Sequence, residues 1–333
     1  MMKWSLEDIH LPLKFNWKIA RNETLFKTNL LVRLKVDELE GLGEVAFNIR
    51  YGEDSEKLKH EFEHFSHDFP QDIESVEEVM EFCAQKELSS SLRFGIESAF
   101  VHYLAVASGK SVHELLGMPS VTSLKTSFSL PIMPIGELDE FIKKHGLERF
   151  QSLKLKVNHE NAIESFNQLA KNYKGKIRVD ANESWSDPDQ VLHFLEKIKK
   201  LDSLEFLEQP LKADLHDESL DLKKYSPVMI FADESLTTQN ITEYYSDRFH
   251  GVNIKLMKSG SYLKAIRQLR EARKLGLKTM IGCMIETTLG ISSAMNIAYG
   301  ADYLDLDGCL LIEKDPFNFI LEEKGRLFRA DLH

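Results

Sequence analysis

The chain has 333 residues, 43% of them hydrophobic and 29% charged, a composition typical of globular proteins and unlike that of disordered, collagen-like or disulfide-rich chains. Acidic residues outnumber basic ones by 53 to 42, so the net charge is −11 and nothing indicates a nucleic-acid partner. No apolar run approaches the ~18–20 residues of a membrane span, and the start lacks the apolar core of a signal peptide, so we expect a cytoplasmic protein without a membrane partner.

The first part of the sequence is typical of an α+β domain, which we place over residues 1–120. Residues 29–36 (NLLVRLKV) are rich in β-forming side chains, and residues 42–47 follow as the second strand of a hairpin. Helical patterns come next, over residues 54–69, 73–86, 91–109 and 112–117.

From about Lys125 onward, short apolar strands alternate with amphipathic helices. The strands are expected at residues 125–130, 152–157, 177–180, 204–208, 228–233, 251–255, 278–282 and 303–307. Parallel strands need a crossover of a dozen or more residues, and eight such units in roughly 185 residues fit a closed α/β barrel. We therefore predict a barrel over residues 121–315, with its chemistry at the carboxyl ends of the strands.

The second barrel strand carries two lysines. In residues 152–157 (SLKLKV) side chains alternate, so Lys154 and Lys156 are expected inside the barrel and the leucines outside. Buried lysines are costly unless they are paired or used, and their mutual repulsion is expected to lower the pKa of one of them, which suits a general base. On this motif alone, an exposed edge strand with solvated lysines is an equal alternative.

Three carboxylates follow three consecutive strands. Asp180 ends IRVD, Glu208 ends FLE, and Asp233 ends FAD, with spacings of 28 residues (180 to 208) and 25 residues (208 to 233). Each spacing matches one βα unit, so the three acids should meet at the barrel mouth. Such a cluster requires a cation, and hard oxygen ligands favour Mg²⁺ or Mn²⁺. The alternative for any one of them alone is a helix N-cap or a loop charge.

The sixth strand, residues 251–255 (GVNIK), places Asn253 and Lys255 inward by the same alternation. Lys255 then lies roughly opposite Lys156, whereas Lys258 lies past the strand end and is expected to be solvated. A metal ion between two opposed lysines suits removal of a proton next to a carboxylate: one lysine takes the proton, and the other returns a proton to the opposite face, which inverts the carbon.

The last barrel strand ends with Asp305 and Asp307, which alternation places on one side. Two further acids away from the metal ligands need a cationic partner. A substrate ammonium group is one candidate, and barrel lysines or arginines are the alternative.

Five segments together resemble the enolase superfamily: KLK (154–156), VDAN (179–182), EQP (208–210), ADES (232–235) and NIKLMKSG (253–260). More narrowly, they are similar to the branch of muconate-lactonising enzymes, o-succinylbenzoate synthases and dipeptide epimerases. The resemblance covers nearly the whole chain. It implies an α+β capping domain, a modified TIM barrel of the (β/α)₇β type, and a C-terminal segment (316–333) that packs back on the capping domain. Residues 281–290 contain no His, which argues against the mandelate-racemase and sugar-acid dehydratase branches.

The resemblance also implies roles for the barrel residues. The metal ligands would be Asp180, Glu208 and Asp233, the acid/base pair Lys156 and Lys255, and Lys154 would support Lys156 and help bind the substrate carboxylate. Asn182 and Glu234 would hold these groups in place. Asp305 and Asp307 resemble the dipeptide-epimerase feature that binds the substrate's N-terminal ammonium.

The capping domain is expected to close the pocket with two loops, residues 17–28 and 46–53. Arg21 resembles the position at which some Ala-Glu epimerases hold the substrate's side-chain carboxylate, and the alternative is a solvated loop residue. Glu286 is either a pocket residue or a loop charge.

The leading hypothesis is a Mg²⁺-dependent dipeptide epimerase that inverts the α-carbon of the C-terminal residue by 1,1-proton transfer through an enediolate. The alternatives are an o-succinylbenzoate synthase, a muconate-type cycloisomerase, or a catalytically silent binding barrel. We expect a small dipeptide as the partner, and assembly into a homo-oligomer is left open.

Overall fold

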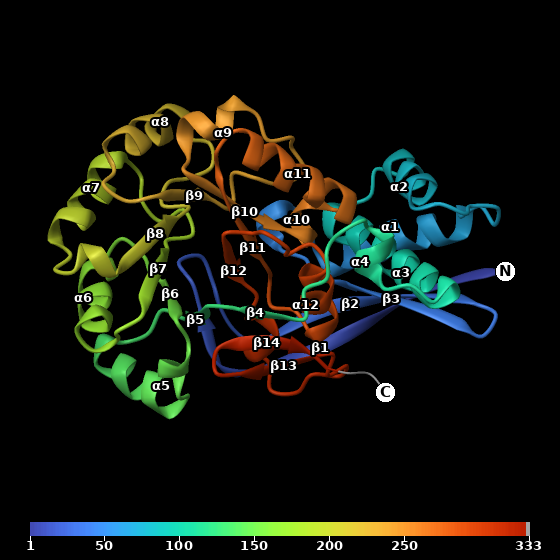
Figure 1. Ribbon diagram of the computed structural model, residues 1–333, viewed down its shortest axis with the longest axis horizontal. Helices are drawn as coiled ribbons and strands as arrows, with labels where there is room; N and C mark the ends of the chain where they lie inside the picture. Colours follow the sequence, from blue (N-terminus) through green and yellow to red (C-terminus); the bar gives the residue numbers. More distant parts are fainter. Residues whose placement is uncertain (331–333) are drawn as a thin grey trace.

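A computed structural model describes residues 1–330 and shows an antiparallel sheet domain beside a barrel (Figure 1). The sheet has the order β1 (Met2–Lys18), β2 (Glu23–Val36) and β3 (Leu39–Val45). The predicted hairpin is confirmed in β2 and β3. The sequence analysis missed β1, although apolar residues alternate along it from Ile9 to Trp17, which is the pattern of a half-buried strand.

Helices α1 (Ser55–Asp68) and α3 (Ser90–Ser108) pack on this sheet, and α2 (Val76–Gln85) and α4 (Val112–Leu115) contact α3. The long helix α3 packs directly on β3, and Gly43 permits this contact because a Cβ there would collide with the backbone of Gly95. The α+β domain predicted from the sequence is therefore present; we call it the cap.

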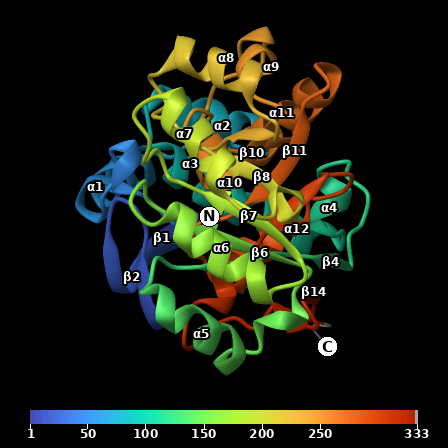
Figure 2. The same ribbon diagram turned by 90° about the vertical axis from the view of Figure 1, so that its left-hand side faces the viewer.

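The barrel contains eight parallel strands in the order of the chain, with β5 and β12 at the two ends of the series. Helices lie outside the strands, as α6 and α7 do in Figure 2. The predicted modified TIM barrel is confirmed. Its strands are β5 (Phe128–Leu130), β6 (Ser152–Lys156), β7 (Lys176–Asp180), β8 (Leu204–Glu208), β9 (Ile230–Ala232), β10 (Gly251–Lys255), β11 (Lys278–Gly282) and β12 (Tyr303–Asp305), and its helices are α5 (Leu138–Lys144), α6 (Ala162–Asn172), α7 (Pro188–Lys197), α8 (His216–Tyr225), α9 (Glu243–Arg248), α10 (Leu256–Ser259), α11 (Tyr262–Lys274) and α12 (Thr288–Met295).

Side chains join the first and last barrel strands. Within the described residues β5 and β12 share no backbone ladder. Instead, Ser127 Oγ donates to Asp305 Oδ1 (2.6 Å) and Ser129 N donates to Asp307 Oδ2 (2.6 Å). The two aspartates thus complete the barrel as well as facing its interior.

Large side chains fill the amino end of the barrel. Phe206 stacks on Phe231 with ring centroids 4.2 Å apart, and the Arg178 guanidinium lies 5.3 Å from the rings of both Phe206 and Tyr303. Because these residues precede the strand ends by two positions, they fill the barrel below the site.

Two buried glutamates of the cap, which we call the interface glutamates, bind helix N-termini of the barrel. Glu97 accepts a hydrogen bond from Tyr262 N at the start of α11. Glu44 accepts from Thr287 N (2.9 Å) and Gly290 N (3.0 Å) at the start of α12. The first turn of a helix has unpaired N–H groups and a positive dipole end, so each glutamate fixes the cap to one barrel helix.

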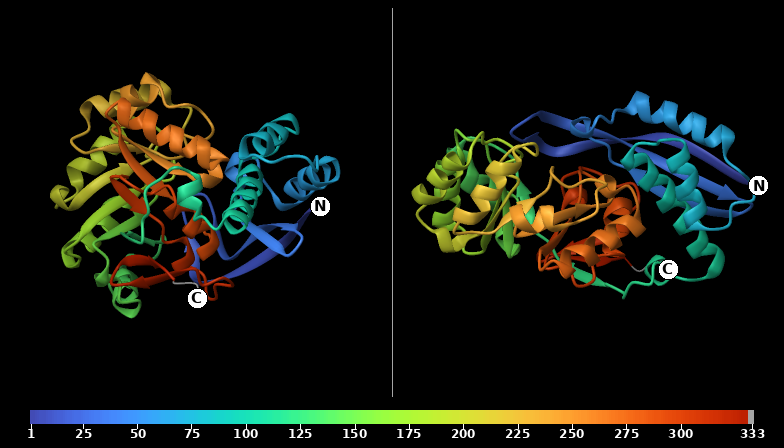
Figure 3. Two further views of the ribbon diagram at one scale, coloured as in Figure 1. Left: turned by 45° about the vertical axis from the view of Figure 1, so that its right-hand side comes forward. Right: turned by 90° about the horizontal axis from the view of Figure 1, so that it is seen from above.

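The β1–β2 ribbon extends from the helical part of the cap along the barrel, as the right-hand view of Figure 3 shows. The C-terminal segment forms the hairpin β13 (Ile320–Glu323) and β14 (Arg326–Arg329), and β14 pairs with β4 (Ser123–Lys125). The packing of residues 316–333 on the cap stays a prediction, since the ladder of the hairpin is with β4 and residues 331–333 lie outside the described part. No helix among the described residues is long and apolar enough to cross a membrane.

Candidate active site

The three predicted metal ligands lie together at the carboxyl ends of neighbouring strands. Asp180 pairs in register with Glu208, and Asp233 follows β9; one carboxylate oxygen from each lies within 4.8 Å of the others. All three side chains are buried. Glu208 Oε1 accepts from Asn253 Nδ2 (2.8 Å), and Glu208 Oε2 lies 2.8 Å from Lys154 Nζ. Three buried carboxylates with oxygens this close together are hard donors that fit a divalent cation such as Mg²⁺.

Two lysines stand on either side of this cluster in the strand order. Lys156 Nζ on β6 lies 2.5 Å from Asp180 Oδ2, and Lys255 Nζ on β10 lies 2.8 Å from Asp233 Oδ2. The alternation inferred from the sequence is therefore confirmed for both strands, and solvated edge lysines are excluded, because both side chains are buried.

Lys154 lies deeper and contacts several acids at once. Its Nζ is 3.0 Å from Asp180, 2.8 Å from Glu208 and 2.7 Å from Asp305. Repulsion from Lys156 does not set its pKa: burial favours the neutral amine, but the carboxylates of Asp180, Asp305 and Glu208 outweigh burial and hold the pKa of Lys154 well above its ordinary value. The expected lowering is thus not found at Lys154.

Neighbouring lysines affect the pKa values of the three clustered acids. Burial raises the pKa of every carboxyl here, yet the charges of Lys154 and Lys156 outweigh it and keep the pKa of Asp180 below its ordinary value. Lys255 and Lys258 do the same for Asp233. For Glu208 the effect of burial outweighs that of the lysine charges, and its pKa rises to about 7.

Lys258 was expected to be solvated, and this expectation is wrong. Its side chain is buried and its Nζ lies 2.5 Å from Asp233 Oδ1. After β10 the chain turns at once into the short helix α10, which folds Lys258 back over the strand end. Strand alternation does not extend past the end of a strand, so the sequence pattern gave no signal for it.

Asn182 and Glu234 lie beside the cluster. Asn182 N donates to Asp180 Oδ1 (3.0 Å), and Asn182 Nδ2 donates to Glu234 Oε1 (3.2 Å). Asn182 has a φ of 44°, a left-handed conformation that asparagine tolerates better than most residues. Through these hydrogen bonds Asn182 connects Asp180 to Glu234, the residue after Asp233.

Arg21 reaches the barrel from the turn between β1 and β2. It donates to Glu234 Oε1 (2.7 Å), to Glu183 Oε2 (2.9 Å) and to the backbone oxygen of Asn182 (2.9 Å). Arg21 lies in an exposed loop, as one alternative predicts, and its guanidinium is engaged by two protein carboxylates.

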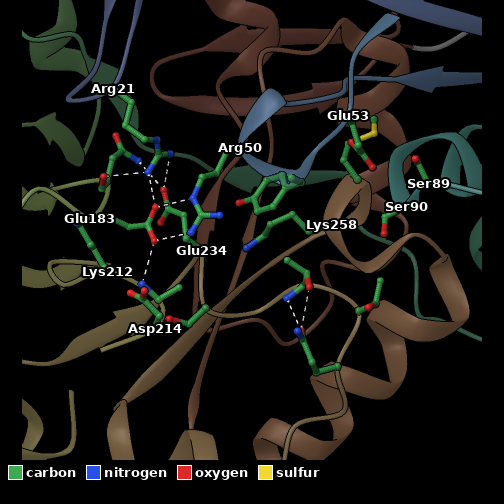
Figure 4. Close-up of a pocket in the computed structure, with 18 of the residues that line it drawn as sticks. Arg21, Arg50, Glu53, Ser89, Ser90, Glu183, Lys212, Asp214, Glu234 and Lys258 are labelled. Carbon is green, nitrogen blue, oxygen red and sulfur yellow. Dashed lines mark hydrogen bonds and ion pairs between the residues drawn. The ribbon is translucent and has the colours of Figure 1, made fainter. Parts of the chain in front are cut away.

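Glu183 is a residue that the sequence analysis missed. Its carboxylate also binds Arg50 Nη2 (2.7 Å) and accepts from Ala213 N (2.9 Å), so two cap loops and two barrel loops meet on it (Figure 4). Arg21 and Arg50 are more than 130 residues away along the chain, and no local pattern announces such a contact. We call Glu183, Arg21 and Arg50 the latch.

Asp305 and Asp307 face the site from β12 and its end. Asp305 is bound by Lys154 and Ser127, so the predicted alternative of a barrel lysine partner applies to it. Burial raises the pKa of Asp305, but Lys154 outweighs it and lowers the pKa to about 2. Burial and then the charge of Asp305 raise the pKa of Asp307 to about 6.

Glu286 is buried rather than a loop charge. Its Oε1 accepts from Met284 N (2.7 Å), and burial followed by the charge of Glu44 raises its pKa to about 8. It does not line the cavity beside the lysines; its neighbours Met284 and Ile285 do.

The site opens into two cavities separated by Arg21, Tyr51, Asn182 and Glu234, which line both. The outer cavity has a volume of about 1640 Å³ and includes the latch. The inner cavity lies between the strand ends and the cap, and both loops expected to close the pocket contribute to its wall. The inner cavity is lined by barrel residues including Lys154, Lys156, Lys255, Asp305 and Asp307, and by cap residues including Trp17, Arg21, Lys27 and Phe47.

Comparisons with known proteins match the part of the chain that contains this site. A family model described as "Enolase C-terminal domain-like" matches residues 137–308. An L-Ala-D/L-amino acid epimerase of Pedosphaera parvula is 34% identical over 331 residues, covering 95% of this chain and 93% of that protein.

Two crystal structures extend the similarity to both domains. An enolase family member from Agrobacterium tumefaciens, with homology to dipeptide epimerases and with sodium and L-Ala-L-Glu bound, is 26% identical with a TM-score of 0.88, covering 99% of this chain and 98% of that one. A dipeptide epimerase from Methylococcus capsulatus, complexed with Mg and L-Arg-D-Lys, is 27% identical with a TM-score of 0.85, covering 98% and 96%.

Proposed function

This chain belongs to the enolase C-terminal domain-like family of the enolase superfamily, and from that premise we propose that it is an isomerase that epimerises dipeptides. The proposed reaction inverts the α-carbon of the C-terminal residue by 1,1-proton transfer through an enediolate. One observation supports the proposal: Lys156 on β6 contacts Asp180 and Lys255 on β10 contacts Asp233, and these strands lie on either side of the carboxylate cluster in the strand order, which suits a two-base inversion.

Asp180, Glu208 and Asp233 are the residues that would hold Mg²⁺. When bound, this ion supplies positive charge that stabilises the negative charge developing on the substrate carboxylate. Lys154 lies against two of the ligands and adds a second positive charge on the same side. Lys156 removes or delivers the α-proton on one face, and Lys255 does so on the other.

The substrate's ammonium group is assigned to Asp307, supported by Asp305. Ser129 N donates to Asp307 Oδ2, and among the described residues no lysine or arginine forms an ion pair with Asp307. A carboxylate without a cationic partner on the wall of the inner cavity suits an ammonium group. An o-succinylbenzoate or muconate substrate has no group to match this carboxylate.

The test is α-proton exchange. We would incubate the protein with Mg²⁺ and a library of L,L-dipeptides in D₂O and follow the α-proton signal of the C-terminal residue by NMR. The proposal expects exchange together with formation of the L,D product. If every dipeptide keeps its α-proton, the proposal fails.

Asp307→Asn separates the epimerase from the alternatives of the same branch. We expect it to lower kcat/KM for dipeptides by about 10–100-fold, because a charge-assisted hydrogen bond to the ammonium is lost. Asp302→Asn is the matched control, since Asp302 lies at the amino end of β12 and contacts Lys278. An o-succinylbenzoate synthase or cycloisomerase would show no dipeptide exchange to lose.

A further inference from the structure

We propose that Lys27 of the cap binds a carboxylate on the side chain of the substrate's C-terminal residue, so that the enzyme prefers dipeptides ending in an acidic residue. This inference rests on the proposed function, because it assigns a substrate class to the same cavity. It differs from the expectation for Arg21 in naming another residue, on another element, as the anion-binding group.

Ion pairing distinguishes Lys27 from the other cations of the inner cavity. Lys154, Lys156 and Lys255 each have a carboxylate oxygen within 3.0 Å, and Arg21 has two such partners. In the described part of the chain, no carboxylate oxygen lies within the 4.0 Å of an ion pair from Lys27. It is therefore the one cation of this cavity for which residues 1–330 provide no counter-charge.

Arg21 is a poor alternative for this role. Its guanidinium is bound by Glu183 and Glu234, and Glu234 is buried. A substrate carboxylate bound to Arg21 would be the third acid on a guanidinium whose charge two acids already neutralise. It would also weaken the ion pair between Arg21 and the buried Glu234. Breaking a buried ion pair is costly, so the pair favours a positioning role for Arg21.

The surroundings of Lys27 suit recognition of an anion. It lies on β2 and lines the inner cavity with Trp17 and Phe47, and its Nζ lies 5.9 Å from the centroid of the Phe47 ring. Lys27 is half-buried, and burial lowers the pKa of its ammonium group. An anion placed beside the ammonium group would compensate for the hydration that it loses on burial.

The substituents of the reacting carbon indicate which part of the substrate meets Lys27. The α-hydrogen must point at Lys156 or Lys255, the carboxylate at the acid cluster, and the peptide nitrogen toward Asp305 and Asp307. The side chain takes the remaining direction, away from the strand ends and toward the wall that the cap provides.

The experiment compares L-Ala-L-Glu with its neutral isostere L-Ala-L-Gln. In the wild-type protein we expect kcat/KM for α-proton exchange to favour the Glu dipeptide by about 10–100-fold, the range for a charge-assisted hydrogen bond. Lys27→Met should abolish most of this preference while still exchanging L-Ala-L-Gln. Lys18→Met, at an exposed lysine near the end of β1, is the matched control and should keep the preference.

Three outcomes are distinguishable. Loss of the Glu preference in Lys27→Met alone supports the inference. Exchange of both dipeptides with no Glu preference in the wild type, or with a preference that survives in Lys27→Met, overturns the inference and leaves the proposed function standing. Absence of exchange with any dipeptide refutes the proposed function, and the inference falls with it. Thermal unfolding of each variant shows that the fold is retained, and Lys27→Arg should restore the preference if Lys27→Met unfolds.

Discussion

Two groups of buried carboxylates occupy different regions of this molecule, and they behave in opposite ways. At the boundary between cap and barrel, the interface glutamates Glu44 and Glu97 accept hydrogen bonds from backbone N–H groups at helix N-termini. In the barrel mouth, Asp180 and Asp233 face lysines. All four residues are at most 2% exposed, so burial alone does not separate them.

Their pKa values diverge because their partners differ. Burial raises the pKa of Glu97 to about 7 and that of Glu44 above its ordinary value, since backbone hydrogen bonds do not fully compensate for lost hydration. At Asp180 and Asp233 burial acts in the same direction, but full positive charges outweigh it. For these four acids the kind of partner, a full charge or a backbone dipole, decides the direction of the pKa shift, and burial does not.

The largest effect should come from neutralising an acid of the barrel mouth. Asp233→Asn removes a metal-ligand candidate and the partner of Lys255, so we expect at least about a 100-fold loss of α-proton exchange. Mg²⁺ should raise the melting temperature of the wild type and not that of Asp233→Asn, because only a bound ligand stabilises the folded state. Glu97→Gln is the control and should keep both the exchange and the Mg²⁺ effect. Equal Mg²⁺ stabilisation of all three proteins would contradict the assignment.

Removing an interface glutamate should reduce stability instead. Glu97→Ala leaves Tyr262 N and the Ser261 hydroxyl without their buried acceptor, which should lower the free energy of unfolding by about 1–3 kcal/mol. Denaturant unfolding measures this loss, with Glu97→Gln expected to be milder because it keeps an acceptor oxygen. If Glu97→Ala is as stable as the wild type, the interface glutamates do not have the structural role described here.

The same glutamate predicts a dependence of stability on pH. Glu97 has a pKa of about 7 in the folded state, against 4.5 ordinarily, so between these values the folded state binds more protons than the unfolded state. Stability should therefore fall as pH rises through this window, with a contribution of up to about 1.4 kcal/mol per pH unit from this residue. Unfolding curves of wild type and Glu97→Gln at pH 5, 6 and 7 test the sign, and the variant should show the weaker dependence.

The smallest effect is expected at Glu286. Its pKa of about 8 means that it is mostly protonated at pH 7, so Glu286→Gln should change the stability at that pH by less than about 0.5 kcal/mol. At pH 9 the wild type must hold a buried charge and the variant need not, so the variant should be the more stable protein. Thermal melts at the two pH values measure the stability difference between variant and wild type. If this difference is the same at pH 7 and pH 9, Glu286 does not titrate as described.

The sequence predicted the features of the site that depend on local rules. Side-chain alternation placed Lys154, Lys156 and Lys255 inside the barrel, and the βα spacing brought the three acids together. No local rule predicts contacts between segments that are distant in the sequence. Glu183 contacts Arg21 and Arg50 only because the cap folds over the barrel. The sequence predicts a loop over residues 17–28, whereas Lys27 lies on β2, so no local pattern indicates its position on the wall of the inner cavity.

The most direct test of the account separates the two lysines by stereochemistry. In D₂O with Mg²⁺, Lys156→Met and Lys255→Met should both lose epimerisation of the dipeptide by about 100- to 10,000-fold, the usual contribution of a general base. Each variant should still exchange the α-proton of one configuration only, L or D, and the two variants should retain opposite ones. If either variant exchanges both configurations, or if both retain the same one, the lysines do not act on opposite faces of one carbon.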